Sequence, residues 1–266
     1  MTFEAFLAQS APVILADVTA TKGSTPREVG AFMLVSEAGL WGTIGGGNLE
    51  FAAIDCARGI LAGHETEQTL TFTLGADSGQ CCGGVVEVRF TRLDAHGIEA
   101  LRGRHAEQQG LNPDVFVFGA GHVGRALAAA LAPLPLRVVM VETRKDELEG
   151  LPPTTETRLV AMPESLVRDI RPGGAVIVLT HDHALDFLIA AEALQRRDLA
   201  YVGMIGSKTK RGVFGHHLAR QGLDPALMAR LVLPIGGSAV RDKRPEVIAA
   251  LVAAEVLTAV LSPQDG

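Results

Sequence analysis

Val115-Phe-Val-Phe-Gly-Ala-Gly-His-Val-Gly124 decides the fold of the second half of this chain. Four apolar residues typical of a buried strand run directly into the pattern G-x-G-x-x-G, and the residues that follow continue as a helix. This order is typical of the phosphate-binding turn of a dinucleotide fold. Gly119 would make the tight turn, Gly121 would let the backbone approach a pyrophosphate, and Gly124 would allow close helix–strand packing. The helix start, beside His122, would present free N–H groups and a positive dipole end to an anion.

Strands and helices alternate after this turn. Strand patterns occupy residues 115–118, 137–141, 158–161, 175–179 and 201–205, and helical patterns occupy 123–131, 164–170, 185–196, 209–221 and 246–261. Such alternation predicts a mainly parallel sheet with helices on both faces. The predicted fold class is therefore α/β, with a Rossmann-like domain over residues 114–266.

The first third of the chain predicts a separate N-terminal α/β domain over residues 1–95. Strand patterns occupy residues 13–18, 31–35, 40–44, 69–74 and 85–90, and a helix capped by Asn48 is predicted up to about residue 61. The polar segment 96–113 carries a short helical pattern and ends in Asn112-Pro113, which breaks the chain before the glycine turn. We therefore predict a linker over residues 96–113.

Composition excludes several classes of protein. The 266 residues are 47% hydrophobic and 20% charged, as expected for a compact α/β protein. A net charge of −6 argues against a nucleic-acid-binding surface, and no apolar stretch approaches the roughly 20 residues that a membrane helix needs. The N-terminus lacks the basic start of a secretory signal, and three cysteines, two of them adjacent, cannot form a disulfide framework. We therefore expect a protein of the reducing cytoplasm.

Glu142 ends the second predicted strand of the Rossmann-like domain. An acid at this place accepts hydrogen bonds from the adenine-ribose hydroxyls, which favours NAD over NADP. Arg144 lies close by and could instead meet a 2′-phosphate. A Rossmann-like domain that holds another phosphorylated ligand, or none, stays open as an alternative.

Thr180-His-Asp-His-Ala-Leu-Asp186 follows a predicted buried strand and so lies at the carboxyl end of the sheet, where open α/β folds bind ligands. His181 or His183 could contact such a ligand. The simpler interpretation is that Asp182 caps the next helix, and a metal site would need further ligands elsewhere in the chain.

Two features of the first domain could bind an anion. Gly45, Gly46 and Gly47 precede a helix and could cradle a phosphate, although three glycines can also serve only a tight turn. Arg27, on the turn-rich segment 23–28, offers a forked donor to phosphate or carboxylate, although an isolated loop arginine is more often solvated.

Gln80-Cys-Cys-Gly-Gly84 is the most unusual segment. Cys81 and Cys82 lie on a glycine-rich stretch, where backbone N–H groups could stabilise a thiolate that ligates a soft metal or carries sulfur. Structural zinc is improbable because no C-x-x-C partner exists. Cys56, within an apolar helical stripe, is predicted to be part of the core.

Five motifs together resemble the xanthine dehydrogenase accessory proteins of the XdhC/CoxI family. They are Thr21-Lys-Gly-Ser-Thr-Pro-Arg-Glu28, Gly42-Thr-Ile-Gly-Gly-Gly-Asn-Leu-Glu50, Gln80-Cys-Cys-Gly-Gly84, Phe118-Gly-Ala-Gly-His-Val-Gly124 and Tyr201-Val-Gly-Met-Ile-Gly-Ser-Lys208. The segment 238–244 departs from the family pattern. Members of this family bind molybdenum cofactor (molybdopterin), protect it as chaperones while a cysteine desulfurase sulfurates the metal, and help to insert it into the large subunit of xanthine dehydrogenase, an enzyme of purine catabolism.

The resemblance implies roles for particular residues. Cys81 or Cys82 would contact the molybdenum or its sulfur. Arg27, the glycines 45–47 and the turn 119–124 would contact the pterin phosphate. A homodimer is a further expectation.

The alternative hypothesis is an NAD(P)-dependent oxidoreductase with a cysteine-bearing substrate domain. That reaction would need a proton donor or base near the nicotinamide, for which His181 and His183 are the obvious candidates. A Rossmann fold alone does not decide between the two functions.

Overall fold

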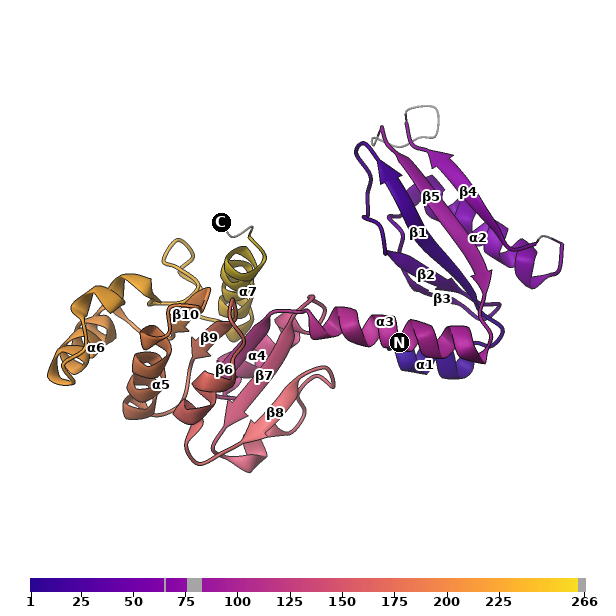
Figure 1. Ribbon diagram of the computed structural model, residues 1–266. Helices are drawn as coiled ribbons and strands as arrows, with labels where there is room; N and C mark the ends of the chain where they lie inside the picture. The colour runs from indigo at the N-terminus through magenta and orange to yellow at the C-terminus, as the bar shows by residue number, and fades with distance from the viewer. Residues whose placement is uncertain (65, 76–82, 263–266) are drawn as a thin grey trace. The chain divides into compact units, whose positions relative to one another are not determined.

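The computed structural model describes residues 1–64, 66–75 and 83–262, and the chain divides into two compact units, Met1–His105 and Ala106–Gly266 (Figure 1). The boundary between the units falls within helix α3 (Ala95–Gly110), which takes up most of the predicted linker. None of the helices in the described parts of the chain is both long and apolar enough to cross a membrane.

The first unit is built on a five-stranded antiparallel sheet in the order β3-β2-β1-β5-β4. In chain order its elements are α1 (Phe3–Gln9), β1 (Ile14–Lys22), β2 (Phe32–Val35), β3 (Leu40–Gly42), α2 (Gly47–Leu61), β4 (Gln68–Thr73) and β5 (Val85–Arg92), with α3 starting at Ala95. Side chains alternate across β1, so Ile14 and Ala16 face the cluster that includes α2, while Leu15 joins the cluster that includes α1. Both faces of the central strand are therefore buried.

Helix α1 is an element that the sequence pattern did not predict. Thr2 caps it through a hydrogen bond from the Ala5 N–H at 3.3 Å, and Phe3, Phe6 and Leu7 are buried at i, i+3, i+4 spacing. Seven residues are too few for that spacing to be recognised as a period.

The second unit confirms the predicted Rossmann-like α/β fold. Six parallel strands lie in the order β11-β10-β9-β6-β7-β8. The elements are β6 (Asp114–Phe118), α4 (His122–Leu131), β7 (Arg137–Glu142), η2 (Lys145–Leu148), β8 (Glu156–Leu159), η3 (Pro163–Asp169), β9 (Ala175–Val178), α5 (His183–Gln195), β10 (Tyr201–Met204), α6 (Lys208–Arg220), η4 (Pro225–Arg230), β11 (Leu231–Val232) and α7 (Pro245–Leu261). The strand order reverses between β6 and β9, which makes their carboxyl ends the topological switch point of the sheet.

The strands of the second unit are apolar on both faces because helices cover both. Val115 and Val117 belong to the core cluster that contains residues of α4 and α7, whereas Phe116 and Phe118 belong to the cluster that contains residues of α5 and α6. This explains why β6 is an uninterrupted buried run in the sequence.

Several elements of the second unit differ from their prediction, and the 3-10 helices η2 and η4 were not predicted. Residues 163–169 form the 3-10 helix η3 where an α-helix was predicted over 164–170. Strand β8 begins at Glu156, two residues before the predicted strand. Strand β11 was not predicted, since two residues cannot show a period.

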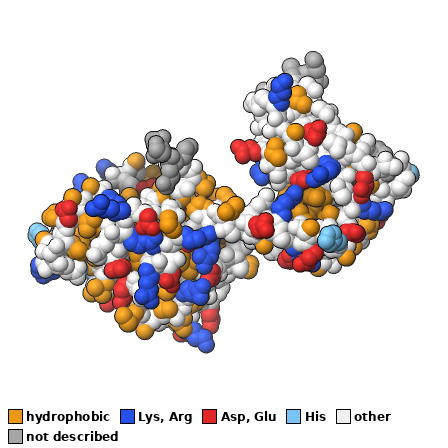
Figure 2. All heavy atoms as spheres, viewed as in Figure 1, with side chains coloured by type: hydrophobic (Ala, Val, Ile, Leu, Met, Phe, Trp, Pro, Cys, Tyr) orange, Lys and Arg blue, Asp and Glu red, His pale blue; other side chains and the backbone are white. Residues whose placement is uncertain are grey.

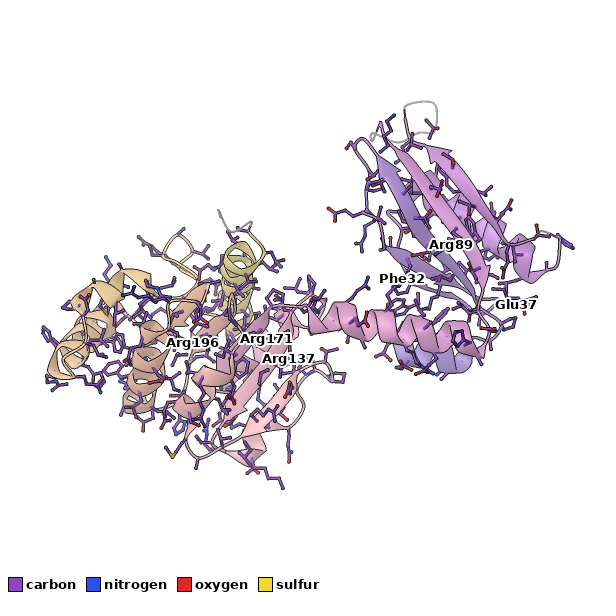
Figure 3. The ribbon with its side chains drawn as sticks, viewed as in Figure 1. Phe32, Glu37, Arg89, Arg137, Arg171 and Arg196 are labelled. Carbon is purple, nitrogen blue, oxygen red and sulfur yellow. The ribbon has the colours of Figure 1, made fainter. Side chains whose placement is uncertain are left out.

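A buried carboxylate at the start of β6 forms ion pairs at the amino-terminal edge of this sheet. Asp114 accepts hydrogen bonds from Arg137 at 3.2 Å and from the Nε of Arg171 at 2.9 Å, both labelled in Figure 3. Burial raises the pKa of Asp114, but the bonds from Arg171 and Arg137 outweigh it and hold the pKa below its ordinary value. These charges lie at the amino end of the strand, away from the switch point, so we regard this cluster as structural.

Candidate functional site

Two glycines of the turn after β6 are required by packing. Gly119 has a φ of 113°, and a Cβ there would lie 2.4 Å from the carbonyl oxygen of Leu179, just past the end of β9. A Cβ on Gly124 would lie 2.1 Å from the carbonyl oxygen of Gly119. Because both residues lack a side chain, the turn can pass close to the end of β9 and α4 can pack closely against the turn, as the sequence predicted.

Neither packing nor backbone angles require a glycine at 121, although glycine is a common N-cap residue. Its φ of −66° suits any residue, and a Cβ there would meet nothing within 4 Å. It is the N-cap of α4, and His122 is exposed on the first turn of that helix. The missing side chain therefore leaves open space in front of the helix N-terminus, which is where the predicted phosphate contact would lie.

Glu142 joins the end of β7 to this turn. Its carboxylate, in a residue only 4% exposed, accepts hydrogen bonds from the N–H groups of Ala120 at 3.0 Å and Thr143 at 2.8 Å. It also accepts from the Nη2 of Arg144 at 3.2 Å. Burial raises the pKa of this carboxyl, but the bonds from Arg144, Ala120 and Thr143 outweigh it and lower the pKa from 4.5 to about 2. The predicted contact of Glu142 with a ribose stays a prediction, because the carboxylate already has partners within the chain.

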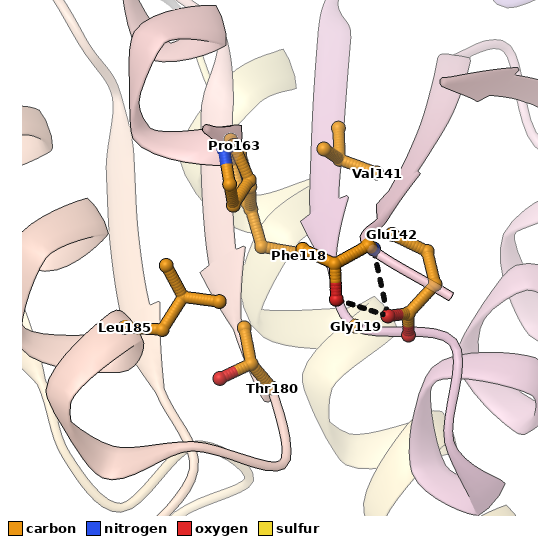
Figure 4. A pocket seen from close by; sticks show the side chains of 8 residues that line it. Phe118, Gly119, Val141, Glu142, Pro163, Thr180 and Leu185 are labelled. Atoms are coloured by element: carbon orange, nitrogen blue, oxygen red, sulfur yellow. Dashed lines mark hydrogen bonds between the residues drawn. The ribbon is translucent and has the colours of Figure 1, made fainter. Parts of the chain in front are cut away.

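A small cavity lies at the switch point, between the ends of β6, β7 and β9 (Figure 4). Its volume is about 10 Å³, which is roughly the room for one water molecule. Its walls are mainly apolar with a few polar groups at the edge. The lining residues are Phe118, Gly119, Val141, Glu142, Thr143, Pro163, Thr180 and Leu185.

In the motif after β9 the histidines are exposed to solvent and the aspartate between them caps a helix. His181 and His183 are both exposed, and Asp182 caps α5 by accepting the Ala184 N–H at 2.7 Å, as the simpler interpretation predicted. Within the described ranges no three His, Cys, Asp or Glu side chains are grouped so that they could hold a metal ion. A ligand contact by either histidine stays a prediction.

A buried ion pair beside this motif was not predicted. Asp186 is fully buried and accepts hydrogen bonds from the Nζ of Lys210 at 2.5 Å and from the hydroxyl of Thr180 at 2.7 Å. The two charges lie on α5 and α6, 24 residues apart, so that no local spacing reveals them. Because Thr180 also lines the cavity, the pair holds one wall of the switch point in place.

In the first unit, three motifs that are distant in sequence come together. A Cβ on Gly45 would lie 2.3 Å from the Cγ of Pro26, and a Cβ on Gly84 would lie 2.4 Å from the carbonyl oxygen of Ser24. The loop that carries Arg27, which is exposed, thus lies against both glycine segments. Cys81 and Cys82 fall outside the described residues.

The glycine run before α2 holds a carboxylate of its own chain. Gly45, Gly46 and Gly47 all have positive φ, and the Oε1 of Glu50 accepts the N–H groups of Ile44 at 3.0 Å and Gly45 at 3.3 Å. Burial raises the pKa of Glu50, but hydrogen bonds from the side chain of Thr43 and from the turn outweigh it and hold the pKa below its ordinary value. Part of the predicted anion cradle is therefore occupied by Glu50.

The predicted cap of α2 was wrong. The N-cap is Gly46, and Asn48 is already within the helix. The reason is the positive φ of the glycine run, which lets the helix begin two residues earlier. Glu50 reaches back to the N–H groups of Ile44 and Gly45, which precede the cap. Cys56 is a core residue as predicted, at 6% exposure.

An open pocket of about 380 Å³ lies beside the start of α2. It is formed by the first turns of α2 and the end of β4. The lining residues are Asn48, Leu49, Ala52, Thr71, Phe72, Thr73 and Leu74. The N–H of Leu74 donates to the carbonyl oxygen of Gly84 at 2.8 Å, which ties this wall to the segment that follows the two cysteines.

Comparison with known families matches both units. Residues 115–256 match the family described as the XdhC Rossmann domain, and residues 6–73 match the XdhC and CoxI family. A relative named uncharacterized protein YqeB, from Escherichia coli K12, is 29% identical over 260 residues, which cover 94% of this chain and 44% of that protein. The chain thus spans less than half the length of this relative.

The fold also occurs in a solved structure. A crystal structure from Bacillus halodurans, described as a xanthine dehydrogenase, superimposes with a TM-score of 0.76 and 19% identity. The match covers 98% of this chain and 95% of that one. At this identity the likeness establishes a shared fold over both units.

Proposed function

The chain belongs to the XdhC and CoxI family, and from this membership we propose that it is an accessory protein that matures an enzyme of the xanthine dehydrogenase type. It holds molybdenum cofactor while a cysteine desulfurase supplies sulfur to the metal, and it then delivers the cofactor to the large subunit of the target enzyme. In this role the chain binds and shields a ligand and has no turnover of its own.

The observation that carries this proposal is the convergence of three motifs in the first unit. The loop with Arg27 packs on Gly45 on one side and on Gly84 on the other. These three segments are far apart in sequence, and Gly84 follows two residues after Cys82. A tertiary arrangement that gathers a basic residue, a glycine turn and the neighbourhood of two thiols suits a ligand with an anionic end and a soft-metal end.

The residues of this region fit the proposed ligand in size and in kind. The pocket of about 380 Å³ beside α2 lies within the roughly 300–1,000 Å³ typical of small-molecule sites. A Cβ on Gly46 would meet nothing within 4 Å, so the outer side of the glycine turn is open even though Glu50 takes its inner N–H groups. Arg27 would hold the phosphate, and Cys81 or Cys82 would contact the metal or its sulfur. The cofactor would supply the molybdenum that receives the sulfur.

The direct test is the ligand itself. The full chain is purified from cells that make molybdenum cofactor, then denatured, and the extract is assayed for the fluorescence of oxidised pterin and for molybdenum. We expect both in near-equal amounts. If neither accompanies the protein from such cells, the proposal is wrong.

Substitutions then test which residues contact the ligand. We expect Cys81→Ala or Cys82→Ala to lower the retained molybdenum at least tenfold, and Arg27→Ala to lower it severalfold, because a charge-assisted phosphate contact is lost. Cys56→Ala, in the core, and Arg58→Ala, exposed at the end of α2, are the matched controls and should retain the ligand. Full retention by both cysteine variants would remove the thiols from the site.

A further inference from the structure

The outer strand of the first sheet, β4, has a free edge of a kind that proteins usually avoid. Among the described residues β4 pairs only with β5, so the backbone groups on its other side have no strand partner there (Figure 1). An open row of N–H and C=O groups pairs readily with other chains, and exposed edges are therefore normally short, charged or covered.

The remaining edges of the two described sheets are protected in these ways. Strand β3 has three residues and β11 has two, while β8 carries the charged residues Glu156 and Arg158. Strand β4, Gln68-Thr-Leu-Thr-Phe-Thr73, has six residues, neither a charge nor a proline, and an unbroken register with β5. In Figure 2 the surface over β4 is mainly white, the colour of uncharged side chains and backbone. Strand β4 is thus the edge best suited to pair with another strand.

One hydrogen bond shows which residues of β4 face the free side. The Leu74 N–H donates to the carbonyl oxygen of Gly84 at 2.8 Å, and this pair continues the register of β4 with β5. Hydrogen-bonded pairs alternate along an antiparallel ladder, so Phe72 and Leu70 also bond to β5. The residues between them therefore direct their N–H and C=O groups away from the sheet. These are the exposed threonines Thr69, Thr71 and Thr73.

We propose that a second copy of this chain occupies this edge, with the two β4 strands antiparallel about a two-fold axis at Thr71. The sequence is symmetric in kind around this residue, since Leu70 and Phe72 flank it and Thr69 and Thr73 lie beyond them. A two-fold interface needs such self-complementarity, because the same surface meets itself. This interface does not depend on the ligand proposed for the first unit.

In this register the free backbone groups of the two strands match. Thr71 faces Thr71 of the second copy, Thr69 faces Thr73, and each pair exchanges two hydrogen bonds. On the other face Leu70 lies opposite Phe72 in a non-hydrogen-bonded pair, where side chains approach most closely. A shift by one residue would set the free donors opposite residues whose N–H groups already bond to β5.

The charges near the strand are compatible with this pairing. Strand β4 is itself uncharged, so no like charges face each other across the axis. Glu67, one residue before the strand, falls opposite Gly75 of the second copy rather than opposite another acid. Its Oε1 also accepts the Arg92 N–H at 2.6 Å and is thus held by its own chain.

The pairing also covers apolar side chains that the first unit leaves half-buried. Helix α2 packs over β1, β2 and β5, so the side chains of Leu70 and Phe72 lie at the margin of the core beneath it. Leu70 borders an open pocket of about 780 Å³ between α2 and β4, and Phe72 borders the one of about 380 Å³. A second β4 would set its own Leu70 and Phe72 beside them, and this burial favours association.

The first test measures the mass of the full chain in solution by sedimentation equilibrium at micromolar concentration, where we expect two chains. Thr71→Pro removes the N–H that faces the second copy but none that bonds to β5, and proline is tolerated on edge strands. It should raise the dimer dissociation constant at least tenfold, whereas Thr71→Val, which keeps the N–H, should stay dimeric. A monomeric wild-type chain, or a Thr71→Pro variant that dimerises as tightly as the wild type, overturns the proposal.

The second test examines the register with charges and does not depend on how well proline is tolerated. In the double variant T69E/T73K each glutamate faces a lysine of the second copy, and it also faces Arg89 of its own chain. This variant should dimerise at least as tightly as the wild type. The double variant T69E/T73E sets like charges opposite each other and should dissociate at least tenfold more readily. Equal self-association of the two double variants, with matching circular dichroism spectra, contradicts the pairing.

Both tests use protein from cells that do not make molybdenum cofactor. The mass of the chain is then measured without the ligand, and the pterin assay is carried out on a separate preparation. A monomeric chain that retains pterin overturns only the interface, and a dimeric chain without pterin overturns only the function proposed above.

Discussion

The two units each place a glycine turn before a helix, and each turn is held by a glutamate, but the two glutamates come from different places. In the first unit Glu50 lies on the helix that the turn begins, and it binds the N–H groups of Ile44 and Gly45. In the second unit Glu142 comes from a neighbouring strand and binds the N–H of Ala120, on the side of the turn that faces β7. Burial raises the pKa of both carboxyls, but a side-chain hydrogen bond, from Thr43 to Glu50 and from Arg144 to Glu142, together with turn N–H groups outweighs it and lowers the pKa.

The difference shows which turn is available to a ligand. Glu50 takes N–H groups at the turn that a bound anion would otherwise use, so the first turn offers fewer donors than its three glycines suggest. Glu142 holds the second turn from behind and leaves the N-terminus of α4 open at Gly121. A glycine-rich turn before a helix is therefore not by itself an anion site, because its donors can be satisfied from within.

The largest expected change in unfolding free energy comes from replacing a glycine that packing requires, compared with one that it does not require. Gly124→Ala places a methyl group 2.1 Å from the carbonyl oxygen of Gly119 and should lower the unfolding free energy of the second unit by about 3 kcal/mol. Gly215→Ala, on α6, meets nothing within 4 Å and should raise it by about 0.5–1 kcal/mol. Urea unfolding followed by circular dichroism measures both. Equal stability of the two variants would show that the turn relaxes and that Gly124 is not a packing residue.

A smaller change in unfolding free energy is expected when Glu142, which holds the second turn, is replaced. Since the folded pKa of Glu142, about 2, lies below 4.5, its stabilisation is complete above about pH 4.5 and is lost as the pH falls through about 2. Glu142→Gln should lower the unfolding free energy at pH 7 by on the order of 2 kcal/mol and flatten this acid dependence. Unfolding curves at several pH values test it, with Glu149→Gln, an exposed residue, as the control. An unchanged acid dependence in the glutamine variant would mean that Glu142 does not stabilise the fold.

The smallest effect is expected in the first unit. Glu50 is partly exposed and lies within its own helix, so Glu50→Gln should lower the unfolding free energy by less than about 1 kcal/mol. Hydrogen exchange of the Ile44 and Gly45 amides should nevertheless become faster, because their acceptor is weakened. Glu28→Gln, on the neighbouring loop, should leave both amides unchanged. If Glu50→Gln lowers the unfolding free energy as much as Glu142→Gln does, the contrast between a glutamate on its own helix and one on a neighbouring strand is not valid.

Local patterns in the sequence predicted most of the elements. The apolar run of β6, the glycine motif after it, the cap at Asp182 and the core position of Cys56 all depend on residues within one turn or one strand of each other. The predictions that failed or were missing involve elements too short to show a period, such as α1 and β11, or features set by backbone conformation and by distant partners. Asn48 was predicted as the cap of α2, but the positive φ of three glycines lets the helix begin earlier. The ion pair of Asp186 with Lys210 joins two helices that are separate in sequence.

The sequence by itself determined the α/β class, the parallel sheet of the second unit and the family, because each rests on residue types at short, regular spacings. Only the tertiary structure decided which glycine turn is open, that Glu142 is tied to Ala120 and Arg144, and that the Arg27 loop lies between Gly45 and Gly84. The physical reason is that hydrogen-bond partners and close backbone approaches are set by strand order and helix packing, which bring together residues that are far apart along the chain.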